Sequence, residues 1–131
     1  FNHESELDFS KFDYVVDAID SVDSKCELLR TCNLKQISFI MALGTARKLD
    51  PTLLRVSKLS KTSVDPLAKK LRYFARKENL GDCKVVYSTE EALPITKVDY
   101  QDKLVNGSMI FVPASAGLLI AQQVVQDLIK D

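Results

Sequence analysis

The chain has 131 residues, the length of about one domain, and its 18 basic and 18 acidic residues give a formal net charge of zero. Hydrophobic residues make up 46% and charged residues 27%, which excludes a disordered polypeptide because the apolar content can offset chain entropy. Zero net charge also excludes a globally basic nucleic-acid-binding protein, while leaving room for a local basic surface.

The first part of the chain has the pattern of a strand, a helix and a second strand. Short apolar runs at 14–19 and 37–43 predict two buried strands, and the segment 22–35 predicts a helix capped by Asp20 or Ser21. A strand, helix and strand at this spacing predict a right-handed parallel crossover. Helices on both faces of such a sheet would explain why both runs are mainly apolar instead of alternating.

The middle of the chain predicts a third strand and a second helix. Residues 52–59 alternate weakly, as in a strand with one solvent-facing side. Asp65 is expected to cap a helix that starts at Pro66, where the amide that proline lacks would be unpaired anyway. The helix is predicted to reach about residue 79 and to end at Gly81.

The last part predicts a buried strand and a long helix. The strand is expected at 83–88, and a polar, mobile connection at 89–105 follows it. Residues 109–112 predict a short strand that turns at Pro113 into a helix ending near Lys130.

Residues 104–126 carry no charge and are numerous enough to cross a bilayer. Within this stretch, however, glutamines gather on one side of the predicted helix and apolar residues on the other. We therefore expect an amphipathic helix packed on the core and no membrane span. The apolar side that we expect to be packed consists of Leu118, Ala121, Val125 and Leu128.

The three cysteines, Cys26, Cys32 and Cys83, are widely spaced and form no C-x-x-C motif. Neither a disulfide framework nor a zinc site is predicted. Free or buried thiols are typical of a reducing compartment, so a cytoplasmic protein is expected.

Asp17 and Asp20 flank the end of the first predicted strand. Ligands of open α/β sheets bind outside the carboxyl ends of the strands. A pair of carboxylates at that place is able to hold Mg²⁺, which takes oxygen ligands and keeps waters and phosphates. The alternative is that both side chains only cap the helix or face solvent.

Basic residues concentrate between Arg55 and Lys77, where eight bases accompany a single acid, Asp65. Such a surface attracts phosphate backbones, although a solvated helix face of a neutral protein explains it equally well. The side chains predicted to share one side of the helix are Lys69, Arg72, Tyr73 and Arg76.

Several segments resemble one enzyme superfamily along nearly the whole chain. The run D-A-I-D-S-V at 17–22, followed by Lys25, resembles the ATP-site strand of the ThiF/MoeB-type adenylating enzymes, relatives of ubiquitin-activating enzymes. The runs K-L-D-P-T at 48–52 and K-T-S-V-D-P-L-A at 61–68, with Arg72, resemble the tRNA threonylcarbamoyladenosine dehydratase branch.

This resemblance implies an α/β fold, the C-terminal half of a Rossmann-like ThiF/MoeB domain. Its sheet would be mostly parallel, with some antiparallel strands and flanking helices, and residues 1–131 would form one domain. The chain contains neither G-x-G-x-x-G nor G-x-x-x-x-G-K-[ST], so the phosphate-binding loop would belong to a missing N-terminal half. The turn at 44–47 is also poorer in glycine than is common in the family.

The resemblance further implies an enzyme that uses ATP and Mg²⁺ to activate the carboxylate of threonylcarbamoyladenosine in tRNA and close it into a cyclic form. Asp20 matches the family's aspartate that faces Mg²⁺ and the ATP phosphates, and Asp17 matches its structural strand neighbour. The expected partners are tRNA, the missing half and a second copy of the chain. The residues expected to contact substrate or RNA are Lys48, Lys69, Arg72, Tyr73 and Arg76.

Two other functions stay open at this stage, and the chain by itself is expected to be inactive. One is activation of a sulfur-carrier or ubiquitin-like protein, which a reactive thiol at Cys83 would favour. The other is a non-catalytic interaction module with the same fold, which an absence of nucleotide binding in the full-length protein would favour.

Overall fold

A four-stranded sheet with the order β1-β2-β4-β3 organises the protein in the computed structural model, which describes residue 1 and residues 7–130. Three strands run parallel: β1 (Val15–Asp17), β2 (Phe39–Ala42) and β4 (Lys84–Ser88). The fourth, β3 (Leu54–Lys58), is antiparallel to β4. The prediction of a mostly parallel α/β sheet with an antiparallel strand is confirmed.

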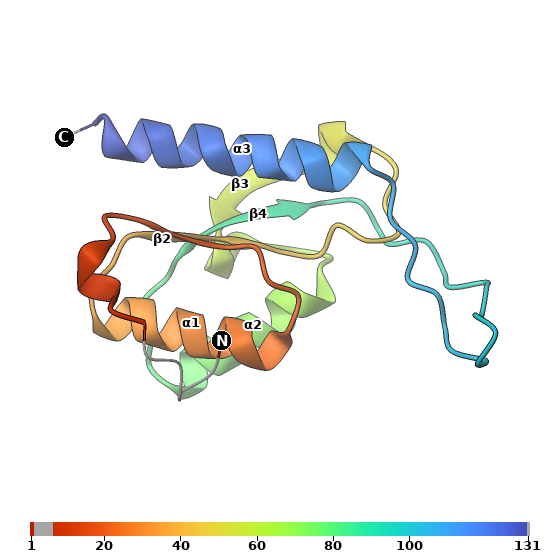
Figure 1. The fold of residues 1–131 in the computed structure, drawn as a ribbon, viewed down its shortest axis with the longest axis horizontal. Coiled ribbons are helices and arrows are strands. Elements are labelled where there is room, and N and C mark those ends of the chain that lie inside the picture. Colours follow the sequence, from red (N-terminus) through yellow and green to blue (C-terminus); the bar gives the residue numbers. More distant parts are fainter. Residues whose placement is uncertain (2–6, 131) are drawn as a thin grey trace.

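Helices cover both faces of this sheet (Figure 1). On one face lie α1 (Val22–Leu34) and α2 (Pro66–Lys77), and on the other lies α3 (Phe111–Leu128). Each face has its own apolar core, which explains why β2 and the centre of β4, Val85–Tyr87, are apolar on both faces. Three short 3-10 turns complete the elements, at Phe9–Lys11, Pro51–Leu53 and Leu59–Lys61.

The helix starts follow the predicted capping chemistry. Of the two candidate caps for α1, the structure uses Ser21. Asp65 caps α2 by accepting from the amides of Leu67 at 2.8 Å and Ala68 at 3.1 Å, and Pro66 is the first helical residue. These carboxylate and hydroxyl oxygens satisfy amides that have no partner within the helix.

Two predicted boundaries are wrong. The helix α2 ends at Lys77, and the left-handed residue that follows it is Asn79, with φ 53°, instead of Gly81. Asparagine tolerates this conformation, so no glycine is needed there. The strand expected at 14–19 shortens to β1, and Val16 is 46% exposed because β1 pairs only with β2 within the part of the chain that the structure describes.

The strand expected at 109–112 is also wrong, because α3 already begins at Phe111. Pro113 falls in the first turn, where backbone amides have no intrahelical acceptor and proline costs no hydrogen bond. None of the helices built from the described residues is long and apolar enough to cross a membrane.

The predicted packing side of α3 is the wrong side. Val112, Ala116 and Ile120 pack on the sheet and are at most 5% exposed. Leu118 and Val125, which we expected in the core, are 73% and 56% exposed. The helix has a second apolar side that the prediction did not name, and the position of the sheet selects it.

Candidate functional site

A cavity of about 460 Å³ opens at the carboxyl ends of β1 and β2, and we call it the strand-end cavity. Its volume and its position are those of ligand sites in open α/β sheets. Four parts of the chain line it: residues 18–20 with Lys25, residues 42–46, Leu67 with Asn106, and the first turns of α3 at Pro113, Ala116, Gly117 and Ile120.

Asp20 stands at the edge of this cavity, between β1 and α1. Its side chain is exposed, and it makes no hydrogen bond or ion pair with the residues that the structure describes. Because Ser21 caps α1, no contact among the described residues uses the Asp20 carboxylate. It is therefore available to a cation or ligand.

Asp17 precedes Asp20 by three residues, but its environment is different. It is 1% exposed, and one of its oxygens, Oδ1, accepts from the Lys25 ammonium at 2.8 Å and from the Ile19 amide at 3.1 Å. Lys25 also donates to the Ala42 carbonyl at 2.7 Å. This pair joins the ends of β1 and β2 to α1, and Asp17 thereby fixes Lys25, which lines the floor of the cavity.

Asp65 holds a second wall in place. Besides capping α2, its Oδ2 accepts from the Gly44 amide at 3.0 Å. A Cβ on Gly44 would lie 3.4 Å from the same oxygen, an ordinary van der Waals contact, so the hydrogen bond itself sets this approach. The start of α2 is thereby fixed to the turn that follows β2.

Comparison with known proteins agrees with this geometry, although no protein-family model matches the chain. The chain is 33% identical to the tRNA threonylcarbamoyladenosine dehydratase of Bacillus subtilis, over 98% of this chain and 55% of that protein. By sequence and by fold, the chain is related to the tRNA threonylcarbamoyladenosine dehydratases.

Two solved structures of the dehydratase TcdA of Escherichia coli share the fold. The complex with AMP superposes with a TM-score of 0.79 at 29% identity, over 93% of this chain and 51% of that one. The complex with ATP gives a TM-score of 0.76 at 30% identity, over 91% and 49%. The chain thus spans about half the length of the dehydratases it matches.

Lys48, an expected contact residue, lies inside the protein and is 4% exposed. Its ammonium donates to the Ser88 carbonyl at 3.4 Å. Burial lowers the pKa of Lys48, and the nearby carboxylates of Asp65 and Glu90 oppose that effect. Lys48 lines a second cavity, which shares Gly44, Ala46, Leu67 and Asn106 with the strand-end cavity.

The basic surface of α2 that the charge pattern predicted is present, but it does not include every predicted residue. Lys69, Lys70, Tyr73 and Arg76 are exposed and line an open groove that begins at Pro66. Arg72 does not belong to it, because its guanidinium donates to the Thr62 carbonyl at 3.0 Å and to the Thr62 hydroxyl. Arg72 holds the segment before α2 in place.

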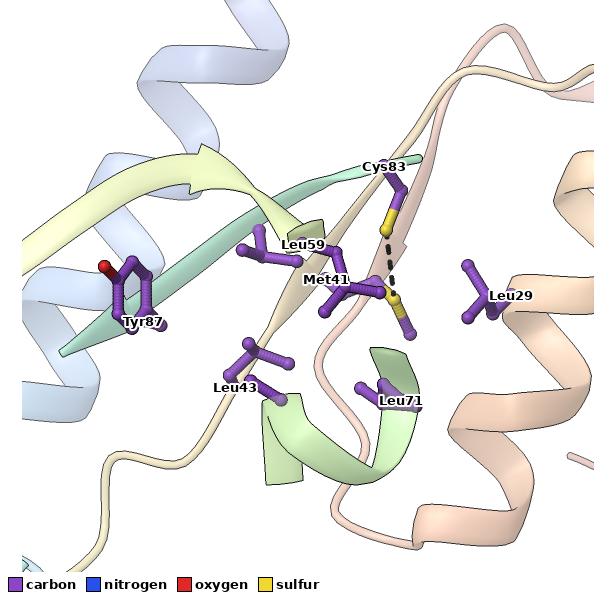
Figure 2. Close-up of a cluster of buried hydrophobic side chains, with 9 residues drawn as sticks. Leu29, Met41, Leu43, Leu59, Leu71, Cys83 and Tyr87 are labelled. Atoms are coloured by element: carbon purple, nitrogen blue, oxygen red, sulfur yellow. Dashed lines mark hydrogen bonds between the residues drawn. The ribbon is translucent and has the colours of Figure 1, made fainter. Parts of the chain in front are cut away.

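Cys83 lies in the core between the sheet and the helices α1 and α2. It is 6% exposed, and its Sγ is 3.8 Å from the Met41 sulfur (Figure 2). Burial raises the pKa of the Cys83 thiol to about 12. Such a thiol is inert, so the feature that would have favoured carrier-protein activation is missing at this position.

Lys25 and Arg47 have structural roles that we did not predict from the sequence. Lys25 appeared only as part of the motif, although a lysine eight residues after Asp17 in the first turns of a helix is a signal for an ion pair.

Within the described residues, no cluster of three or more histidine, cysteine or acidic side chains gathers, so an all-protein metal cage is not formed there.

Proposed function

We propose that this chain is part of an ATP-dependent enzyme that activates the carboxylate of threonylcarbamoyladenosine in tRNA and closes it into a cyclic form. The observation that carries this proposal is the strand-end cavity with the free Asp20 carboxylate at its edge. The same fold in E. coli TcdA is solved with ATP and with AMP, which supports nucleotide binding in this cavity.

The residues at the cavity fit a magnesium ion that arrives with a nucleotide. Mg²⁺ is usually held by one or two carboxylates together with phosphate oxygens and waters, and Asp20 supplies one carboxylate. The bound ion would neutralise negative charge on the phosphates. The floor made by Asp17 and Lys25 and the wall made by Asp65 and Gly44 keep Asp20 and the cavity in a fixed arrangement.

The proposal assigns phosphate binding to a further part of the protein. The chain has no G-x-G-x-x-G loop, and the dehydratases it matches are about twice as long. The outer edge of β1 has unpaired backbone groups within the described chain, and Val16 beside them is half exposed. A parallel strand that continues the sheet at this edge would bring a phosphate loop next to the cavity.

Replacing Asp20 tests the role of the cavity in the intact protein. Asp20→Asn keeps the shape of the side chain and removes the charge that would retain Mg²⁺. We expect kcat for ATP-dependent cyclisation to fall at least about a hundredfold, the typical effect of losing one electrostatic stabiliser. The matched control is Asp23→Asn, an exposed acid in the first turn of α1 that does not line the cavity.

Release of pyrophosphate from ATP measures the first half-reaction of this test, and formation of the cyclic nucleoside in tRNA together with release of AMP measures the second. If Asp20→Asn turns over at the rate of the Asp23→Asn control, the cavity is not the nucleotide site.

We further propose that tRNA lies on the basic surface of α2. Pro66 begins the groove of this surface, and the next residue, Leu67, lines the strand-end cavity. An RNA bound along α2 would therefore reach the cavity with its anticodon loop. Tyr73 is 65% exposed and offers a face on which an unpaired base is able to stack. A tRNA substrate agrees with a cytoplasmic location, as do the free cysteines.

Removing two charges from this surface should weaken RNA binding in a salt-dependent way. We expect Lys69→Ala/Arg76→Ala to lower tRNA affinity and to reduce the slope of log affinity against log salt by roughly 1–2. Lys35→Ala/Lys130→Ala removes two exposed lysines away from α2 and serves as the control. Filter binding across a salt series measures both; equal slopes in the two variants would contradict an RNA site on α2.

A further inference from the structure

The second cavity, which Lys48 lines, lies between the groove of α2 and the strand-end cavity. Its volume is about 220 Å³, and we call it the middle cavity. Pro66 lines both the middle cavity and the groove of α2. Leu67 lines both the middle cavity and the strand-end cavity. A molecule that reaches from the groove into the strand-end cavity would therefore pass through the middle cavity.

The ammonium of Lys48 is the unusual group of this cavity. Lys48 is 4% exposed, yet its Nζ has one acceptor among the described residues, the Ser88 carbonyl, at the long distance of 3.4 Å. An ammonium has three N–H donors, so two of them have no partner within the described chain. A buried cation with so few hydrogen bonds costs free energy unless an anion completes its surroundings.

Two carboxylates act on Lys48 from nearby, those of Asp65 and Glu90, but both are engaged by backbone amides. Asp65 accepts from amides at the start of α2 and in the turn after β2. Glu90 accepts from the amides of Leu49 and Asp50 at 2.9–3.1 Å. Burial lowers the pKa of Lys48 in spite of these carboxylates. The fold by itself therefore disfavours the charged form of Lys48.

The wall of the middle cavity contains a strained turn at Val64. Its φ is 64°, a left-handed value that β-branched residues rarely adopt. The Asp65 amide closes this turn by donating to the Ser63 carbonyl at 2.6 Å, and Arg72 holds the preceding residue, Thr62. Strain of this kind persists only where surrounding contacts fix it, and it is common at ligand sites. The cavity thus has the rigid wall of a preformed site.

We propose that the middle cavity binds the carboxylate of the threonylcarbamoyl group, with the Lys48 ammonium as its counter-ion. This inference rests on the proposed function, because it assigns a place to the substrate of that reaction. A carboxylate carries one negative charge and matches one ammonium, whereas a phosphate would bring more negative charge toward Asp65 and Glu90. Apolar side chains in the lining, such as Val64 and Leu67, suit the aliphatic part of the group.

The order of the three sites agrees with this assignment. An adenosine of an RNA bound along α2 would direct its substituent from the groove into the middle cavity. Adenylation requires the carboxylate to meet the nucleotide, and the shared lining at Leu67 places the middle cavity directly beside the strand-end cavity.

Binding of two forms of one tRNA to the intact protein tests the role of Lys48. One form carries threonylcarbamoyladenosine, and the other carries adenosine at the same position. We expect the wild type to bind the modified form roughly tenfold to a hundredfold more tightly, the effect of a hydrogen bond to a charged group. Lys48→Met removes the ammonium and should lose this preference. Lys35→Met changes an exposed lysine outside the cavities and should keep it.

Thermal unfolding and ATP affinity separate a binding role from a structural one. Because the fold disfavours the charge of Lys48, Lys48→Met should unfold at no lower temperature than the wild type, with an unchanged Kd for ATP. A clearly lower Tm, equal weakening of both tRNAs, or a preference that Lys48→Met retains would each overturn the proposal.

Turnover distinguishes this inference from the proposed function. If the wild type forms the cyclic nucleoside while Lys48→Met keeps the preference for modified tRNA, the middle cavity is not the carboxylate site, and the proposed function stands. An intact protein that forms no cyclic nucleoside from ATP and modified tRNA would refute the proposed function and this inference with it.

Discussion

The ion pair of Asp17 and Lys25 is the central single-residue feature of the site. Both residues are 1% exposed, and the ammonium of Lys25, on α1, binds the carboxylate at the end of β1 and the carbonyl of Ala42 at the end of β2. The other carboxylate oxygen, Oδ2 of Asp17, has no partner among the described residues. A buried carboxylate in this position depends on its cation, because water does not replace the lost interaction.

Removing the cation alone should therefore be more damaging than removing both charges. We expect Lys25→Met to lower the free energy of unfolding by about 3–5 kcal/mol. Asp17→Asn/Lys25→Met removes the charge on both sides and should recover a measurable part of that loss. Urea denaturation of the two variants measures the difference, and equal stability would mean that the pair contributes only packing.

Among the structural elements, the connection between β4 and α3 is held mainly by one arginine. Arg47 adopts a left-handed backbone with φ 59°, at the turn that the sequence showed to be poor in glycine. Its amide donates to the Gly107 carbonyl at 2.9 Å, and its guanidinium donates to the Leu93 carbonyl at 2.7 Å and to Asn106 Oδ1 at 3.0 Å. Asn106 also lines the strand-end cavity, so Arg47 links the cavity to this connection.

Arg47→Ala should loosen the connection and leave the core intact. It keeps the backbone contacts but deletes both guanidinium hydrogen bonds, so we expect faster amide exchange at 91–108 and a small change in Tm. Hydrogen exchange followed by mass spectrometry measures this by segment. Arg55→Ala is the control, because the Arg55 guanidinium donates to the carbonyls of Thr52 and Leu54 in its own segment and to no other described residue. Unchanged exchange at 91–108 would mean that the backbone contacts suffice.

At the scale of the whole molecule, a single carboxylate ties the α3 layer to the sheet. Asp127 accepts from Tyr14 and from Gln123, each at 2.8 Å, and from the Lys84 ammonium. The hydrogen bond from Lys84, followed by those from Tyr14 and Gln123, lowers the pKa of Asp127. Burial raises the pKa of Tyr14, and the hydrogen bond to Asp127 raises it further.

The lowered pKa gives this tie a defined pH dependence. Asp127 stabilises the fold above its unfolded pKa, about 3.9, and this contribution is lost as pH falls through the lower folded value. We expect Asp127→Asn to cost about 1–3 kcal/mol at pH 7 and progressively less below about pH 4. Asp13→Asn changes an exposed acid next to Tyr14 and is the control. A stability difference that does not shrink with acid would contradict this role.

By itself, the sequence determined the features that depend on neighbours along the chain. The caps at Ser21 and Asp65, the apolar strands β2 and β4, and the placing of Asp20 at a strand end all follow from local chemistry and from the motif at 17–22. Only the tertiary structure decided which of two apolar sides of α3 meets the sheet, that Arg72 points to Thr62, and that Lys48 is buried. Those outcomes depend on contacts between residues far apart in the chain, and helical or strand periodicity carries no information about which side finds a partner.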